Sequence, residues 1–176
     1  MKKKSHSPSG QGELRVYFYG RHNTMEINGH YLLDTLKQAV EINSVLPREE
    51  ELAAFLADEI RSLGLEPEWH VVAPGRPNVY VTADLGSSDD ILLLTGHLDT
   101  VGVAANWETN PFEAIESEGR LYGLGVLDMK AGLVCALAAF KALLEDSTLH
   151  RYEVHLRHEL SECLPHQPRF TADLCI

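Results

Sequence analysis

Residues 91–101 read Ile-Leu-Leu-Leu-Thr-Gly-His-Leu-Asp-Thr-Val, an apolar run that ends in a histidine and an aspartate. A continuous apolar run of this length is typical of a strand covered on both faces, as in the sheet of an α/β domain. In open α/β sheets, ligands bind beyond the carboxyl ends of the strands, where His97 and Asp99 fall. This stretch therefore predicts both a fold class and one edge of a site.

A second motif, Gly123-Leu124-Gly125-Val126-Leu127-Asp128-Met129-Lys130, opens a predicted helix over residues 129–144. Apart from Lys130 and Lys141, this helix is apolar around most of its circumference and should be largely buried. The glycines before Asp128 indicate a backbone that closely approaches another group.

Buried imidazole and carboxylate groups are costly unless something pairs with them, and a divalent metal is a common partner. His97 is the candidate ligand. Asp99, two residues on in an extended chain, would accept its second N–H and fix the tautomer. Each residue also has an interpretation without chemistry: the His-x-Asp triplet suits a surface loop, and Asp128 suits a helix N-cap.

The spacing of apolar residues elsewhere predicts a helix over 31–40 and an amphipathic helix that starts at Pro47 and stops at Gly64. Two strands are expected next, over 68–72 and 78–83, with a Pro-Gly turn between them.

The chain is expected to have one folded unit, residues 25–150. A disordered tail over 1–24 would precede it, although Val16–Tyr19 could order locally. A divergent tail over 151–176 would follow, in which residues 152–157 alternate like a strand.

Composition limits the class of protein. The 176 residues suit one domain, with 44% hydrophobic and 23% charged residues, as in ordinary globular proteins. The net charge of −11 argues against a nucleic-acid partner. No apolar run approaches the length of a membrane span, and three cysteines give no disulfide framework. We therefore expect a cytoplasmic protein that binds neither nucleic acid nor membrane.

The two motifs and the loop between them carry a resemblance to a known family. They are Gly-His-Leu-Asp-Thr-Val at 96–101, Trp107 with Asn110-Pro111-Phe112, Gly119 to Gly125, and Asp128-Met129-Lys130. This set resembles the zinc-dependent amidohydrolase and peptidase family that includes acetylornithine deacetylase, succinyl-diaminopimelate desuccinylase, aminoacylase and carboxypeptidase G. The amino-acid sequence around Tyr122 is most similar to that of the acetylornithine deacetylase branch.

The resemblance implies a partial α/β catalytic domain, with a mixed, mostly parallel sheet covered by helices. It also implies two zinc ions, for which cobalt can substitute. His97 would bind one zinc, Asp99 would orient His97, and Asp128 would bridge both metals. The implied reaction is hydrolysis of an amide bond in an N-acyl amino acid or a peptide, with a glutamate as general base.

The resemblance weakens towards the C-terminus. The family has two adjacent glutamates, a base and a zinc ligand, after its next strand. Glu162 is the candidate for one of them, although a solvated surface carboxylate fits it as well, and Cys163 stands in place of the other. The lid or dimerisation domain has no counterpart before Ile176, so a truncated chain with little activity of its own is expected.

Two other functions remain open at this point. The chain could be a non-catalytic remnant that associates with a partner, with a second copy as a homo-oligomer, or with a separate C-terminal half, since an incomplete core exposes apolar surface. It could also be an unrelated hydrolase with a mononuclear site, in which two further ligands converge on His97.

Overall fold

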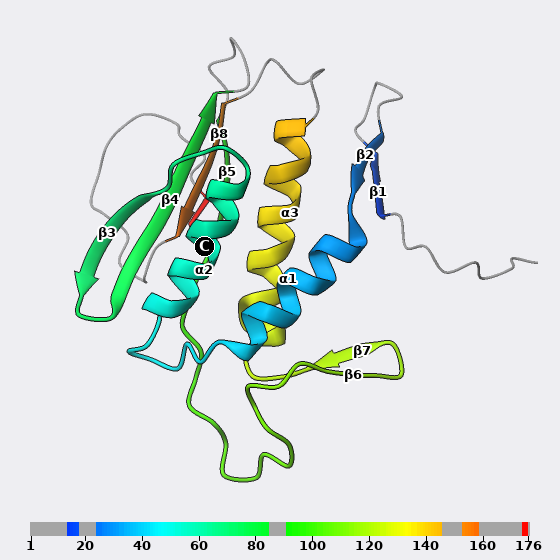
Figure 1. Cartoon of the computed structure of the whole chain (residues 1–176), viewed down its shortest axis with the longest axis vertical. Coiled ribbons are helices and arrows are strands. Elements are labelled where there is room, and N and C mark those ends of the chain that lie inside the picture. Colours follow the sequence, from blue (N-terminus) through cyan, green and yellow to red (C-terminus); the bar gives the residue numbers. More distant parts are fainter. Residues whose placement is uncertain (1–13, 18–23, 85–90, 146–152, 159–173, 176) are drawn as a thin grey trace, which may run out of the picture.

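The computed structural model describes residues 14–17, 24–84, 91–145, 153–158 and 174–175, and shows helices packed on a mixed sheet (Figure 1). The strand order is β3-β4-β8-β5, and β9 pairs with β8 beside this path. The strands are β3 (Glu68–Ala73), β4 (Arg76–Asp84), β5 (Ile91–Gly96), β8 (Glu153–His158) and β9 (Leu174–Cys175).

The strand directions correct one detail of the expected sheet. β3 pairs antiparallel with β4, and β4 antiparallel with β8, whereas β5 and β9 both run parallel to β8. The sheet is mixed, as predicted, but the pairings among the described residues divide evenly and are not mostly parallel. One cause is the short Pro74-Gly75 connection, since a two-residue turn can join only antiparallel strands.

β5 also differs from its prediction. It forms, but it ends the path of described strands, and Leu92 is 41% exposed. The expectation that both faces of this strand are covered is therefore wrong for the described part of the chain. Leu93 and Leu94 are partly buried and pack against the core.

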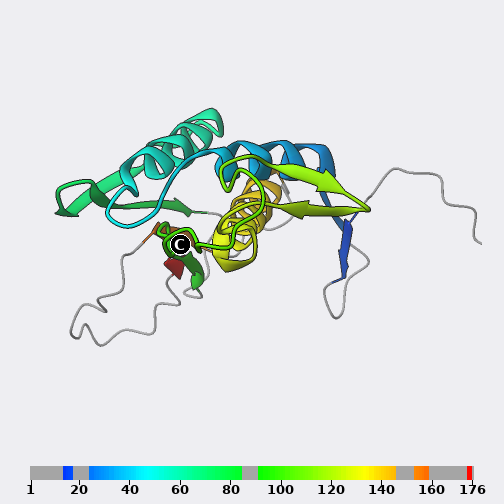
Figure 2. The ribbon, with the colours of Figure 1, turned by 90° about the horizontal axis from the view of Figure 1, so that it is seen from below.

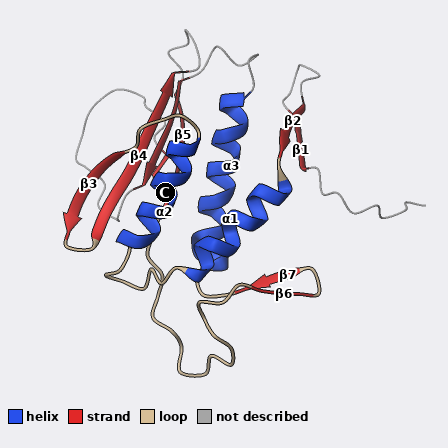
Figure 3. Cartoon of the chain, in the orientation of Figure 1, coloured by secondary structure: helices blue, strands red, loops and turns tan. Residues whose placement is uncertain are grey.

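Three helices lie on that one face of the sheet (Figures 1 and 2). They are α1 (Gly29–Glu41), α2 (Glu50–Ser62) and α3 (Ala131–Glu145). α2 packs on β4, and α3 contacts α1, β5 and β8. A small hairpin of β6 (Ile115–Ser117) and β7 (Arg120–Tyr122) lies apart from this sheet (Figure 3).

The core forms between the helices and the sheet. Its most deeply buried apolar residues include Ala39, Val40, Leu52, Leu56, Ile60, Val79, Val134 and Phe140. The prediction of a largely buried helix before residue 145 is confirmed, because seven residues of α3 are buried. None of the helices in the described ranges is long and apolar enough to cross a bilayer.

The ends of α2 follow local chemistry. The helix stops as predicted, with Leu63 N–H bonded to the Ile60 carbonyl and Gly64 at φ +81°. Its start was predicted too early: Pro47 lies in a turn closed by Arg48 N–H and the Val45 carbonyl, and the helix begins at Glu50.

The segments predicted as tails contain paired strands. Leu14–Tyr17 forms β1 and pairs antiparallel with β2, Thr24–Ile27. The expected disorder is therefore wrong for residues 14–15 and 24, whereas residues 16–17 show the local order that was left open for Val16–Tyr19. Both segments are rich in branched or aromatic residues that favour strands. The strand predicted over 152–157 is confirmed as β8, at 153–158. Leu174–Cys175, also in the predicted C-terminal tail, forms β9, and the remaining residues of both tails lie outside the described ranges.

The start of α1 gives a testable prediction. The Asn28 side chain accepts hydrogen bonds from the backbone N–H groups of His30 and Tyr31, each at 3.1 Å. Asn28→Ala is expected to lower the free energy of unfolding by about 1 kcal/mol, since two orphan donors lose their acceptor. Urea denaturation measures this loss. Asn28→Ser should remain near the wild type, and an equal loss in both variants would contradict the capping role.

Candidate metal centre

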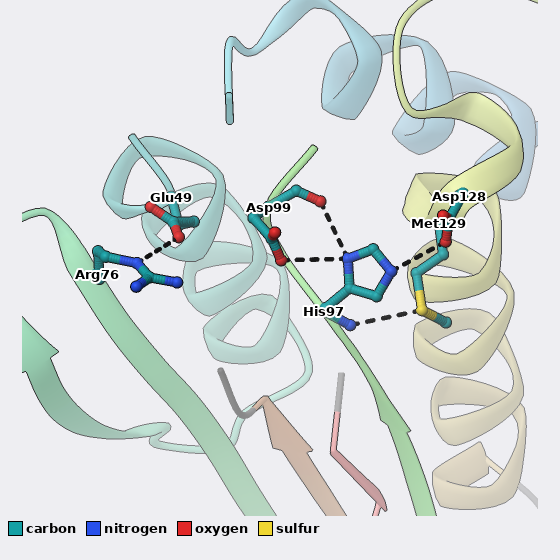
Figure 4. Close-up of polar contacts among 6 residues, drawn as sticks. All are labelled: Glu49, Arg76, His97, Asp99, Asp128 and Met129. Carbon is teal, nitrogen blue, oxygen red and sulfur yellow. Dashed lines mark hydrogen bonds and ion pairs between the residues drawn. The ribbon is translucent and has the colours of Figure 1, made fainter. Parts of the chain in front are cut away.

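His97 and Asp128, thirty-one positions apart in the chain, meet in space (Figure 4). His97 directly follows β5, and Asp128 lies in η1 (Val126–Lys130), the turn that leads into α3. The His97 Nε2 and Asp128 Oδ1 atoms are 2.9 Å apart. The two motifs of the sequence therefore form one site at the carboxyl end of a strand, as the fold class predicts.

Asp99 occupies the other side of the imidazole. His97 Nδ1 lies 3.0 Å from the Asp99 carbonyl oxygen and 3.3 Å from its carboxylate Oδ1. A proton on Nδ1 satisfies these acceptors and leaves the Nε2 lone pair directed at Asp128. In the absence of a metal, only a second proton, on Nε2, lets the ring donate to both aspartates.

The electrostatics follow from this arrangement. Burial by itself lowers the pKa of His97, but the hydrogen bonds and negative charges of Asp128 and Asp99 outweigh it and raise the pKa above its ordinary value. The same features that favour a proton on Nε2 favour a divalent cation in its place.

Asp128 does not act as a helix cap. Its carboxylate bonds to His97, and no hydrogen bond from a helix N–H group to it is found among the described residues. The side chain is 81% exposed, and the backbone is extended, with φ −135° and ψ 94°. The next residue adds a second link, because the His97 backbone N–H donates to the Met129 Sδ atom at 3.4 Å. The turn is therefore joined to the end of β5 through both the side chain and the backbone of His97.

Lys130, noted in the sequence only as an exception in an apolar helix, is among the largest fully buried side chains in the described part of the chain. Its ammonium donates to the Ile42 carbonyl just beyond α1. Burial lowers the pKa of Lys130 to about 8. The sequence did contain a signal for this buried position: a lysine two residues after Asp128, at the start of a helix that is otherwise apolar around most of its circumference.

The donor set suits zinc. Imidazole nitrogen and carboxylate oxygen are both zinc ligands. The ligand atoms of one tetrahedral zinc ion lie about 3 Å from one another. The observed 2.9 Å separation needs only a small adjustment. Within the described ranges, no cluster of three or more acidic, histidine or cysteine side chains could hold an ion, so His97 and Asp128 would supply only part of a ligand set. Glu162 and Cys163 lie outside the described residues.

The fold and this pair define an α/β domain with a candidate cation site at a strand end. Residues 93–162 match the family model described as Peptidase family M20/M25/M40. The chain is 35% identical over 123 residues to a succinyl-diaminopimelate desuccinylase of Methylorubrum extorquens, which covers 68% of this chain and 32% of that protein.

Solved structures agree with this result. An M20 family metallo-carboxypeptidase from Sulfolobus solfataricus matches with a TM-score of 0.66 and 28% identity, over 73% of this chain and 30% of that one. A tripeptidase from Staphylococcus aureus matches with a TM-score of 0.57 and 27% identity, over 74% of this chain and 36% of that one. The chain belongs to the M20/M25/M40 peptidase family and spans about a third of the length of these relatives.

The raised pKa of His97 predicts a pH dependence. A group with a raised folded-state pKa adds stability that is complete below its unfolded pKa of 6.5 and is lost as the pH rises through the higher folded value. With zinc removed by a chelator, the urea midpoint should fall between pH 6 and 8 more steeply in the wild type than in Asp128→Asn. Parallel pH profiles of the two proteins would contradict the His97–Asp128 interaction.

Proposed function

We propose that this chain carries part of a zinc-dependent hydrolase that cleaves an amide bond in N-acyl amino acids or peptides. The observation that carries the proposal is the His97–Asp128 pair at 2.9 Å, with Asp99 on the opposite ring nitrogen. Supporting it, the relatives are a desuccinylase, a carboxypeptidase and a tripeptidase by their names, all of which act on amide bonds.

The residues take complementary roles in this proposal. Asp99 holds a proton on Nδ1, so that Nε2 presents its lone pair to the cation. Asp128 uses only Oδ1 towards His97 and has no other partner in the described part of the chain, which leaves Oδ2 free to bridge to a second ion. When bound, zinc would lower the pKa of a water molecule and polarise the substrate carbonyl. Glu162 remains our candidate for the general base.

The substrate is proposed at the level of its class. The sequence of the motif around Tyr122 favours an N-acetylornithine-like compound, whereas the Methylorubrum extorquens relative is named for a succinyl-diaminopimelate. Both are amino acids acylated on one nitrogen with a second amine. Measuring hydrolysis of N-acetylornithine, N-succinyl-diaminopimelate and a dipeptide, by the chain alone and with a separate C-terminal half supplied, would separate these alternatives.

Metal binding by the whole chain tests the proposal directly. The zinc-free protein is titrated with zinc by calorimetry, and with cobalt as a probe, because its absorption spectrum reports ligand type and geometry. We expect binding that competes with protons at His97. Absence of any zinc or cobalt binding at neutral pH would reject the proposal, and one ion rather than two would reject the bridging role of Asp128.

A second candidate function, association with a partner chain, has its own observation. Next to the site residues, Leu127 is 94% exposed and Val101 is 78% exposed, although large apolar side chains usually avoid water in clusters. Light scattering on the purified chain tests it. A stable oligomer that binds no metal would favour association over catalysis, whereas a metal-binding monomer would favour catalysis.

A further inference from the structure

The side chain of Lys130 poses a physical problem. It is 1% exposed, and within the described ranges its ammonium pairs with no carboxylate and donates only to the Ile42 carbonyl. Removing an ammonium from water is expensive, and an apolar side chain of the same length would avoid that cost. A single neutral acceptor is weak compensation, so packing alone does not explain a lysine here.

The contacts of Lys130 show what it connects. Its backbone N–H donates to the Gly125 carbonyl at 2.8 Å, which closes the turn around Asp128. Its Cδ and Cε atoms lie 3.4 Å from the position that a Cβ would take on Gly125. Its ammonium then reaches Ile42, 88 positions earlier in the chain and just beyond the last residue of α1. One side chain thus ties the turn to a separate element of the core.

Asp128 needs such a tie. It lies outside regular helix, its side chain is exposed, and Met129 after it is also non-helical, with φ −137° and ψ 37°. No helical hydrogen-bond ladder therefore fixes the carboxylate. Its position depends on the Met129 Sδ contact to the His97 backbone and on the anchoring of the turn by Lys130.

We infer that Lys130 is a positioning residue, whose buried ammonium anchors the 125–130 turn to the end of α1 and holds the Asp128 carboxylate at its distance from His97. This inference rests on the proposed function for its effect on zinc, but the anchor itself exists in the zinc-free chain and can be measured there.

The test compares Lys130→Met with Lys141→Met. Methionine keeps the length of the side chain and removes its charge and donor. Lys141 lies in α3, the helix that follows the turn, and is bonded to Glu145 near the surface, so its replacement is a matched control. The readouts are zinc affinity by calorimetry, amide hydrogen exchange of residues 125–130 in the zinc-free chain, and Tm. Since loss of an outer partner typically weakens a metal site 10–100-fold, we expect a zinc Kd raised about 10- to 100-fold in Lys130→Met alone.

The outcomes separate positioning from general stability. Faster exchange in the turn and weaker zinc binding, with Tm near that of the wild type, support the inference, because losing a buried charge offsets losing its hydrogen bond. Unchanged exchange and zinc affinity within twofold of the wild type overturn it, as does an equal effect of Lys141→Met.

The test still decides the role of Lys130 if the wild type binds no zinc or if Lys130→Met does not fold. If the wild type binds no zinc, the proposed function fails, and the exchange rates of the zinc-free proteins alone decide the role of Lys130. If Lys130→Met does not fold, Lys130→Gln replaces it, because a shorter, uncharged donor should loosen the turn without emptying the core. Turn exchange and zinc affinity of wild-type value in Lys130→Gln would then overturn the inference.

Discussion

Replacing His97 with alanine should raise the Kd for zinc by about 100-fold or more, equivalent to about 2.8 kcal/mol. The imidazole is the only nitrogen donor that the described residues direct at Asp128, through an Nε2–Oδ1 separation of 2.9 Å. Loss of groups that merely orient a ligand costs 10- to 100-fold, so loss of the ligand itself should cost at least the upper end of that range. Calorimetric titration of the zinc-free chain at neutral pH measures the change.

His70→Ala is the matched control for this experiment. His70 is exposed on β3, at the opposite edge of the described sheet from β5, and takes no part in the site. It should bind zinc as the wild type does. Equal affinities of His97→Ala and His70→Ala would show that any zinc binds elsewhere, and the assignment of the centre to β5 and η1 would fail.

The sequence predicted the meeting of His97 and Asp128 better than the pairing of the strands around it. The helices, β3, β4 and β5 follow from apolar periodicity and turn residues, which act over a few positions. The meeting of His97 and Asp128 was also predictable, because one motif follows an apolar strand and the other precedes an apolar helix, and ligands of α/β sheets bind beyond the carboxyl ends of the strands.

What the sequence missed depends on contacts between distant segments. β8 lies between β4 and β5, and no local pattern shows that it pairs antiparallel with one and parallel with the other. The role of Lys130 depends on a carbonyl 88 positions away. The position of Pro47 in a turn depends on Val45, which bridges to Thr100 near the site. Such pairings are decided by tertiary packing, which overrides local propensity.

Gly125→Ala is expected to destabilise the chain by about 2–5 kcal/mol. Gly125 has φ +78°, where a Cβ costs about 1–2 kcal/mol. The added methyl would also overlap the Thr100 Cγ2 atom, and Thr100 is buried and branched, so it has no free space to move into. Overpacking of this kind costs typically about 1–3 kcal/mol. Urea denaturation of the zinc-free chain measures the sum.

Gly64→Ala separates the two causes. Gly64 has nearly the same backbone, φ +81°, but no atom lies within 4 Å of the position of its Cβ. Both substitutions reduce the freedom of the unfolded chain equally, so that effect cancels in the comparison. Gly64→Ala should therefore lose about 1–2 kcal/mol, and the excess in Gly125→Ala reports the overlap with Thr100. Equal losses would mean that the turn can move away from Thr100, and a turn that moves so easily could not hold Asp128 in place.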